Sequence, residues 1–263
     1  MARKTRLDLL LVARNHVSSR SKAAAQIMAG EVTVDGRLVD KPGSMVRNDA
    51  EVRLKAKPRY VGRGGLKLEA ALAAFPVAVA GAVCADVGAS TGGFTDCLLQ
   101  HGAARVYAID VGSGILDYRL RIDKRVRLLE GRNARHLDSL PERPSLVAID
   151  VSFTSIRLIL PAVKRWLAAE ADIIALVKPQ FEVGKGEVGK GGIVRSPQLR
   201  RRALQGVVES AESQGMTSAD VIASPITGAK GNVEYLLWLR LTKAPIDTAR
   251  VSSKIDALFA APE

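Results

Sequence analysis

The chain has 263 residues, with 39 Lys+Arg against 27 Asp+Glu, and so a formal net charge of +12. Hydrophobic residues make up 47% of it and charged residues 25%, which is enough to bury an ordinary core and excludes a wholly disordered chain. The length suits one large domain, or a small domain and a medium one. The excess of Lys and Arg favours a polyanionic partner, nucleic acid before an anionic membrane surface, because phosphates bind these side chains.

The positive charge is concentrated near the N-terminus. Residues 1–60 hold 13 Lys+Arg and 6 Asp+Glu, a net +7, which leaves +5 for the rest of the chain. A second group of seven basic residues lies in 119–135. Runs of charge are more often solvated surfaces than sites, but the low acidic content of the first 60 residues favours nucleic-acid contact there. The candidate phosphate-contacting residues are Arg6, Arg14, Arg20, Lys22 and Lys41.

Cysteine, histidine and apolar residues argue against several classes of protein. The two cysteines, Cys84 and Cys97, fall in a predicted buried strand and the helix after it, which excludes a disulfide scaffold. The three histidines have no metal-ligand spacing, so we expect no metal site. The first apolar run is interrupted by Asp8 and is too short for a signal peptide, and no run is long enough to span a membrane. We therefore expect a cytoplasmic protein without a membrane partner.

Two short helices and a small sheet are predicted for the first 60 residues. Thr5, with Asp8 three residues later, is a capping-box-like start for a helix with an apolar face of Leu7, Leu10 and Leu11. A second helix begins near Ser18 or Ser19 and ends at Gly30; its predicted apolar residues are Ala23, Ala24, Ile27 and Met28.

Strands follow these helices. Apolar residues alternate on both sides of Asp35-Gly36, a dipeptide typical of hairpin turns. Residues 51–55 form the last predicted strand before the basic connector 57–59. We place a domain boundary near residue 60, which gives domains 1–60 and 61–263.

From residue 82 onward, apolar strands alternate with helices, as in an α/β domain with a largely parallel sheet. A helix around 66–75 precedes this pattern, and residues 244–263 are expected to add a terminal helix. The connection 224–232 has no room for a crossover helix, so the last two strands should be antiparallel. This predicts the Rossmann-like sheet of class I methyltransferases, seven strands with the last reversed. The predicted strands are 82–87, 105–110, 126–130, 145–150, 172–178, 219–223 and 233–240.

A glycine-rich loop, Asp86 to Gly93, lies directly between an apolar strand and a helix. Small residues there let the backbone approach a ligand at the helix N-terminus. The dinucleotide fingerprint requires glycine where this chain has Ser90, and the acidic residue before the loop favours S-adenosyl-L-methionine instead. Asp110, at the end of the next strand, is placed to accept hydrogen bonds from ribose hydroxyls. A nicotinamide cofactor and a tight turn without a ligand are the alternatives.

A second glycine-rich segment, residues 184–192, nearly spells a phosphate-binding P-loop. Gly191 replaces the magnesium-binding Ser or Thr, and no strand directly precedes the segment, so nucleoside triphosphate binding is rejected. It follows the fifth predicted strand, at the edge where such sheets bind ligands. Two interpretations of this segment are therefore left: a lid over the substrate, or a solvated linker.

Four charged residues are expected near the same edge: Lys67, Asp150, Lys178 and Glu234. Methyl transfer to a hydroxyl requires an oriented oxygen and a base that removes its proton. A lysine serves as that base only when burial and a nearby cation favour its neutral form. Two lysines between two carboxylates suit this chemistry, although each residue alone could equally be a surface charge or part of a structural ion pair.

The chain resembles two known families in several segments. The N-terminal part is similar to an S4 RNA-binding domain at residues 6–8, 19–21, 27, 30–32, 34–36 and 41–42. The remainder resembles the TlyA (haemolysin A) family, whose catalytic domain is FtsJ-like, at residues 61–68, 86–96, 148–153, 176–186 and 231–235.

This resemblance implies a function and assigns roles. Its members are ribosomal-RNA 2′-O-methyltransferases that act on cytidine ribose, in 16S and/or 23S rRNA within 30S or 50S subunits. The four charged residues then match a Lys-Asp-Lys-Glu tetrad with Lys178 as the base, and Phe153 matches the residue that stacks on the flipped target base. RNA contacts would include Arg6, Arg20 and Lys41. The cofactor-binding residues would be Asp86, Gly88, Ser90, Gly92, Gly93, Asp110 and Asn133.

Two other functions stay open at this point. An RNA-binding assembly factor would keep the fold without the chemistry, and a membrane-active haemolysin would match the older family name but lacks a span or amphipathic anchor. The N-terminal helix and the C-terminal extension indicate the longer subtype of the family, whose members modify both subunit RNAs. We expect a monomer.

Overall fold

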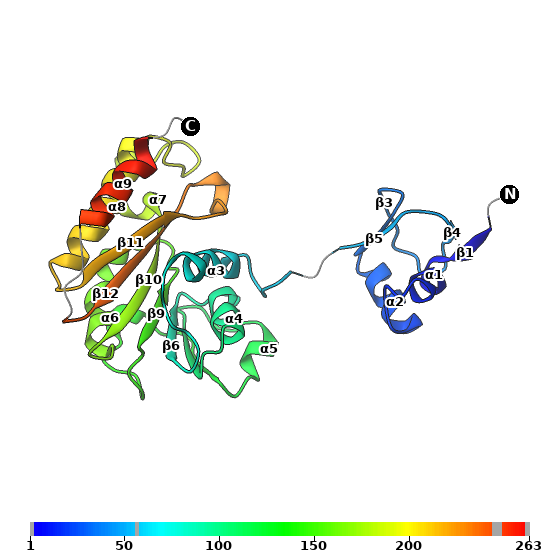
Figure 1. The fold of residues 1–263 in the computed structure, drawn as a ribbon, viewed down its shortest axis with the longest axis horizontal. Coiled ribbons are helices and arrows are strands. Elements are labelled where there is room, and N and C mark those ends of the chain that lie inside the picture. Colours follow the sequence, from blue (N-terminus) through cyan, green and yellow to red (C-terminus); the bar gives the residue numbers. More distant parts are fainter. Residues whose placement is uncertain (1–2, 56–57, 244–248, 261–263) are drawn as a thin grey trace. The chain divides into compact units, whose positions relative to one another are not determined.

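In the computed structural model, residues 3–55, 58–243 and 249–260 are described. The chain forms two compact units, residues 1–58 and residues 59–263 (Figure 1). Among the described residues, no helix combines the length and apolarity needed to cross a membrane.

The N-terminal unit packs two short helices against two small sheets. Strands β3, β2 and β5 are antiparallel neighbours, and β1 pairs with β4. The predicted apolar residues Leu7, Leu10, Leu11, Ala23 and Ile27 are buried together with strand residues. The elements are β1 (Lys4–Arg6), α1 (Leu7–Ala13), α2 (Arg20–Met28), β2 (Val32–Val34), β3 (Arg37–Leu38), β4 (Met45–Arg47) and β5 (Val52–Leu54).

Three details of this unit differ from the prediction. Thr5 does not cap the first helix: it lies in β1, opposite Val46, and Arg6 precedes α1 without a side-chain cap. Met28 is 65% exposed, because α2 ends there and its inner face is formed by Ala23 and Ile27. The pair β1 and β4 was not predicted, since strands of three residues carry too little alternation to be recognised.

The second unit contains the seven-stranded sheet, in the order β11-β12-β10-β9-β6-β7-β8. The predicted reversal is confirmed, because β12 is antiparallel to both β10 and β11. The other neighbours in the sheet, β10 with β9, β9 with β6, β6 with β7 and β7 with β8, are parallel. The strands are β6 (Val83–Val87), β7 (Arg105–Ile109), β8 (Val126–Leu129), β9 (Leu146–Ile149), β10 (Ala171–Val177), β11 (Thr217–Ala223) and β12 (Tyr235–Leu241).

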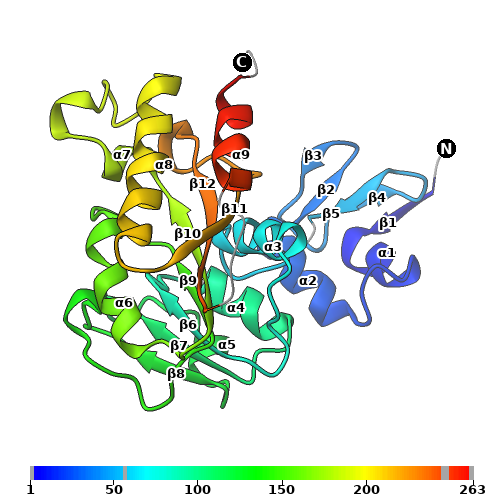
Figure 2. The ribbon, with the colours of Figure 1, turned by 60° about the vertical axis from the view of Figure 1, so that its left-hand side comes forward.

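Helices cover both faces of this sheet (Figure 2). Alternate residues of a strand point to opposite faces, and β6 illustrates this: Cys84 packs in the core beneath α3 and α4, whereas Ala85 packs in the core beneath α6 and α8. The helices are α3 (Gly64–Ala74), α4 (Gly93–Gln100), α5 (Tyr118–Arg121), α6 (Leu160–Trp166), α7 (Pro179–Glu182), α8 (Pro197–Glu212) and α9 (Ala249–Ala260). Short 3₁₀ turns are η1 (Ala134–His136), η2 (Ile156–Leu158), η3 (Lys185–Glu187) and η4 (Ala229–Gly231).

Helix α9 lies within the predicted terminal helix, of which residues 244–248 and 261–263 fall outside the described residues. It packs on β11 and α8, and Lys254 forms an ion pair with the buried Asp220 of β11. The terminal segment therefore completes one face of the sheet.

Candidate functional site

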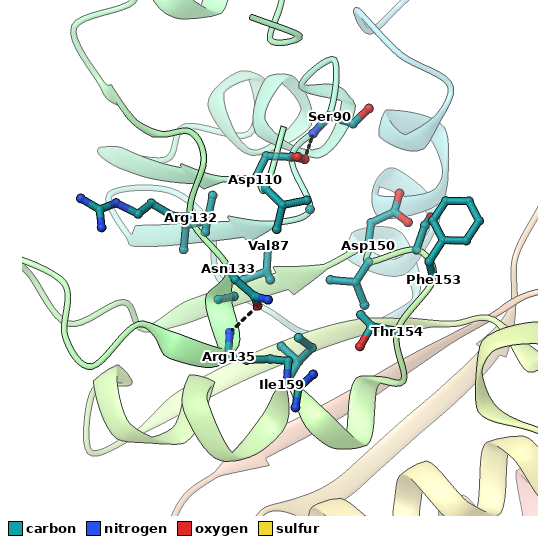
Figure 3. Close-up of a pocket in the computed structure, with 16 residues that line it drawn as sticks. Val87, Ser90, Asp110, Arg132, Asn133, Arg135, Asp150, Phe153, Thr154 and Ile159 are labelled. Carbon is teal, nitrogen blue, oxygen red and sulfur yellow. Dashed lines mark hydrogen bonds between the residues drawn. The ribbon is translucent and has the colours of Figure 1, made fainter. Parts of the chain in front are cut away.

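A cavity of about 600 Å³ opens at the carboxyl ends of β6, β7, β8 and β9 (Figure 3). Its wall includes the residues that directly follow these strands, among them Gly88, Asp110 and Asp150. Ligands of open α/β sheets bind at this edge, because the loops that follow the parallel strands converge there. The sheet thus builds the cavity where the sequence predicted a ligand.

The glycine-rich loop after β6 requires its small residues. Gly88 has φ +88°, and a Cβ placed there would lie 2.5 Å from the carbonyl oxygen of Asp150. Gly92, at φ +97°, precedes α4, and a Cβ there would lie 2.2 Å from a methyl of Leu120. Gly88, Ser90 and Gly93 line cavities of this region, whereas Gly92 contributes through its backbone turn.

Asp110 and Asn133 both line the larger cavity (Figure 3). The two carboxylate oxygens of Asp110 accept hydrogen bonds from the backbone N–H groups of Ser90 and Gly112, each at 2.7 Å. Asn133 Oδ1 accepts one from the N–H of Arg135 at 3.0 Å. Both side chains are therefore held rigidly, with Asp110 joining the glycine-rich loop to the loop after β7.

Asp86, also predicted to bind the cofactor, is completely buried beneath the loop. Its Oδ2 accepts hydrogen bonds from Thr95 N at 2.8 Å and Thr95 Oγ1 at 2.7 Å, while Oδ1 has no hydrogen-bond partner among the described residues. Burial raises the pKa of this carboxyl to about 7, and the nearby charge of Asp150 acts in the same direction. Asp86 therefore supports the start of α4 from inside, rather than lining the cavity wall.

This burial predicts a pH dependence of stability. Since the pKa of Asp86 is about 7 when folded and about 3.9 when unfolded, the folded state binds more protons between these values. The contribution of Asp86 to the unfolding free energy is then largest below about pH 4 and is lost as the pH rises through about 7. Urea unfolding of Asp86→Asn between pH 5 and 8 should show a shallower decline with pH than the wild type. Parallel curves for the two proteins would contradict the assignment.

The four charged residues form two ion pairs. Lys178 Nζ lies 2.6 Å from Asp150 Oδ1 and donates to Ser152 Oγ at 3.0 Å. Lys67 Nζ lies 2.5 Å from Glu234 Oε2, with both side chains buried. Every one of these charges has an opposite charge in contact, as buried charges require.

The sheet register brings the two pairs to the same edge. Val177 is paired with Tyr235, so Lys178 and Glu234 are the next residues on neighbouring strands. Asp150 follows Ile149, which is paired with both Ala175 of β10 and Val87 of β6. Helix α3, which carries Lys67, begins close to this edge, since a Cβ on Gly64 would lie in ordinary van der Waals contact with Asp150 Oδ2, at 3.5 Å.

A smaller cavity of about 120 Å³ adjoins the tetrad. Residues 62–64, the loop residues 88–91 with Gly93 and Phe94, and Asp150 line it, and Gly88, Ser90 and Asp150 also line the larger cavity. A ligand that extends from the large cavity to Asp150 would therefore end beside the charged residues.

Phe153 is 92% exposed and has φ +62°. A bulky residue rarely adopts this conformation, and here it presents the ring to solvent at the cavity rim (Figure 3). The ring lies 5.3 Å from that of Phe181, and Lys178 Nζ lies 6.0 Å from the centre of the Phe181 ring. An aromatic surface is thus available beside the tetrad.

The glycine-rich segment 184–192 is tied to the residues before Glu234. Asn232 is buried; its Nδ2 donates to Gly192 O at 2.9 Å, and its Oδ1 accepts from Val194 N at 3.1 Å. Gly189 forms an isolated bridge with Ile193. Sequence reasoning missed Asn232 and Ser152, whose polar side chains next to the predicted residues were the available signal.

Two of the predicted RNA-binding residues hold a buried carboxylate. Arg6 and Arg20 both contact Asp8 Oδ2, at 2.9 and 2.8 Å, and Asp8 is 2% exposed. The hydrogen bond from Arg6 is the main cause that lowers the pKa of Asp8 far below its usual range. Arg14 donates to the backbone of Asn48 and Ala50, whereas Lys41 is exposed. The guanidinium groups of Arg6 and Arg20 are thus fixed in place while remaining about half exposed.

The sheet, the glycine-rich loop and the acidic residue after β7 form the arrangement expected of a Rossmann-like methyltransferase of the S-adenosylmethionine-dependent class. Comparison with known proteins agrees. The chain belongs to the FtsJ-like methyltransferase family, whose match spans residues 60–241, and it carries an S4 domain at residues 5–52. The resemblance to the TlyA family is confirmed by the relatives below.

The chain is 49% identical over 244 residues to the 16S/23S rRNA (cytidine-2′-O)-methyltransferase TlyA of Mycobacterium tuberculosis, covering 91% of each protein. A hemolysin-like protein of Streptococcus thermophilus matches in structure with a TM-score of 0.74 and 41% identity, covering 99% of this chain and 96% of that one. An S-adenosylmethionine-dependent methyltransferase of Mesorhizobium loti shares the fold, with a TM-score of 0.51 and 12% identity over 66% of this chain and 97% of that one.

Proposed function

We propose that the protein transfers a methyl group from S-adenosylmethionine to the 2′-hydroxyl of cytidine in ribosomal RNA, 16S, 23S or both, within ribosomal subunits in the cytoplasm. The observation that carries this proposal is the pairing of Lys178 with Asp150 and of Lys67 with Glu234 at one edge of the sheet, where Asp150 also lines both cavities. The 49% identity to a protein with this activity over 91% of the chain supports the same choice.

The larger cavity suits a nucleoside. Its 600 Å³ lies within the range of small-molecule sites, and the carboxylate of Asp110 stands at the end of β7, where it can accept hydrogen bonds from ribose hydroxyls. We assign Asn133 to contact with the adenine of the cofactor. The backbone of Gly88, Ser90 and Gly93 would surround the rest of the cofactor, and Asp86 and Gly92 would support that backbone from beneath. S-adenosylmethionine supplies the methyl group as an electrophilic sulfonium.

The tetrad deprotonates and orients the attacking oxygen. We assign Lys178 Nζ as the acceptor of the 2′-hydroxyl proton, a step that requires its unprotonated form. The hydroxyl oxygen would form its bond to the methyl carbon as the methyl–sulfur bond breaks. Asp150, 2.6 Å away, stabilises the ammonium that results and keeps Nζ directed at the hydroxyl. The buried ion pair of Lys67 and Glu234 holds α3 against the start of β12. In this pair the charge of Lys67 is balanced by the carboxylate of Glu234.

Phe153 and the S4 domain bind the RNA. A ribose inside a helix cannot reach the methyl group, so its nucleotide must leave the stack, and the exposed ring of Phe153 offers a surface for the extruded base. The S4 domain, with Arg6, Arg20 and Lys41, contacts RNA phosphates.

Transfer of tritium from labelled S-adenosylmethionine to purified 30S and 50S subunits tests the proposed activity. We expect label in rRNA that digests to 2′-O-methylcytidine. Absence of label from every state of both subunits and from naked rRNA, with a protein that binds the cofactor, would instead favour an RNA-binding assembly factor.

The S4 domain makes a separate prediction. Lys41→Ala should weaken RNA binding and lower the salt dependence of the binding constant by about one per lost phosphate contact. Binding measured at several salt concentrations checks this, with cofactor affinity by calorimetry as the internal control. Arg20→Ala should do the same and should also destabilise the domain, because Arg20 partners the buried Asp8. If either substitution impairs cofactor binding instead, the division of labour between the domains is wrong.

A further inference from the structure

Glu182 is a buried carboxylate at the end of α7 to which neither the cofactor nor the tetrad assigns a task. Its side chain is 1% exposed. Oε2 accepts a hydrogen bond from Ser155 Oγ at 2.5 Å, and Oε1 accepts one from the N–H of Ile156 at 2.8 Å. The guanidinium of Arg157 lies 3.4 Å from Oε2 and also donates to the backbone oxygen of Glu182.

These bonds join two segments that each begin with a member of the tetrad. One is the loop from Asp150 to Ser155, and the other is Lys178 with helix α7, which ends at Glu182. The segments are bonded at their start through Lys178, Asp150 and Ser152, and the rings of Phe153 and Phe181 lie against each other between the two ends. At their other end, the two segments are joined by the hydrogen bonds of Glu182 with Ser155 and Ile156.

The conformation of Phe153 explains why the far end must be fixed. Its φ of +62° is unfavourable for a bulky residue, and such a conformation persists only where the surrounding structure holds it. On one side, Asp150 N donates to Val87 O at 2.9 Å. On the other side, Glu182 accepts hydrogen bonds from Ser155 Oγ and Ile156 N, and the backbone oxygens of both residues accept hydrogen bonds within the turn that follows, from Leu158 N and Ile159 N.

We propose that Glu182 is a positioning residue for methyl transfer: by tying α7 to the loop 150–155, it keeps Phe153 and Ser152 in register with Lys178. This inference rests on the proposed function, because it is the alignment of Lys178 with an extruded nucleotide that the contact would protect. Burial raises the pKa of the Glu182 carboxyl, while its hydrogen bonds oppose that shift.

The test compares Glu182→Ala, Glu182→Gln, Ser155→Ala and the double variant Glu182→Ala/Ser155→Ala in the full-length protein. Glu209→Gln is the matched control, since Glu209 lines the same polar cavity as Glu182 but lies exposed on α8. Three quantities are measured: the single-turnover rate of methyl transfer to ribosomal subunits, the Kd for S-adenosylmethionine, and hydrogen exchange in residues 150–158.

Because misplacing a reacting group by about 1 Å costs up to about a hundredfold in rate, Glu182→Ala should slow single turnover by about 10- to 100-fold. The loss in rate should exceed any loss in cofactor affinity by at least about tenfold, and exchange in 150–158 should accelerate. Glu182→Gln keeps the acceptor for Ile156 N and should recover part of the rate. Ser155→Ala should slow the wild type slightly and have no further effect in the Glu182→Ala background.

Four outcomes would each overturn the proposal. They are a wild-type rate for Glu182→Ala, unchanged hydrogen exchange in this variant, additive effects of the two substitutions on the rate, and equal losses of rate and cofactor affinity. Failure of the proposed function looks different. The wild type would then transfer no label, while the exchange comparison would still report whether Glu182 holds the loop.

Discussion

Replacing Lys178 with alanine should reduce methyl transfer by about a thousandfold, within the range that a positioned general base contributes. The side chain lies 2.6 Å from Asp150 and 3.0 Å from Ser152, which both line the larger cavity. Its removal would leave the 2′-hydroxyl without the proposed proton acceptor. RNA binding and cofactor binding should persist, because the S4 domain and the glycine-rich loop are untouched. Single-turnover kinetics with labelled S-adenosylmethionine provide the measurement.

Lys243→Ala is the matched control for this substitution. Lys243 is exposed and follows β12 at the end opposite to Glu234, so the control removes the same charge from the same unit away from the site. Unimpaired methylation by the Lys178→Ala variant would exclude Lys178 as the base.

Gly88→Ala should destabilise the catalytic unit and abolish cofactor binding. A Cβ there would meet the backbone oxygen of Asp150 at 2.5 Å, in a residue with φ +88°. The left-handed conformation costs about 1–2 kcal/mol and overpacking against backbone a further 1–3, roughly. Against a domain stability of about 5–15 kcal/mol, this is a large loss, to be measured by urea unfolding and calorimetry.

Gly81→Ala separates the two causes, since Gly81 has φ +74° but open space around its Cβ position. Only the conformational cost of about 1–2 kcal/mol applies there, and cofactor binding should be retained. Equal effects of the two substitutions would mean that the contact between Gly88 and Asp150 has no special importance.

The order of elements in the catalytic unit could be predicted because most of its strands are short, largely apolar runs that alternate with helices. The reversed β12 followed from the short connection 224–232, which admits no crossover helix. The positions of Asp110, Asp150 and Lys178 at strand ends followed from the same pattern. These are consequences of local sequence.

The pairing within the tetrad could not be predicted in this way. Lys67 and Glu234 are 167 residues apart, and their contact depends on the position of α3 and on the register that sets Tyr235 opposite Val177. Asp86 was expected at the ligand, yet its carboxylate turns inward to Thr95. The spacing of nine residues between Asp86 and Thr95 does not indicate that the two side chains are in contact.

The error at the first helix has the same origin. Thr5 and Asp8 have the spacing of a helix cap, but Thr5 pairs with Val46 in β1, and Asp8 bonds to Arg6 and Arg20. Thr5 is held by Val46, which is distant in sequence, and Asp8 is held by the guanidinium groups of Arg6 and Arg20. The same contacts give Arg6 and Arg20 a structural task that their charge alone did not indicate.

The most direct test of the proposed activity is to map 2′-O-methylation in rRNA from cells with the protein, without it, and complemented with the wild type or with Lys178→Ala. We predict a 2′-O-methylcytidine in 16S or 23S rRNA that disappears without the protein, returns with the wild type and does not return with Lys178→Ala. Identical modification maps with and without the protein, or restoration by Lys178→Ala, would contradict it.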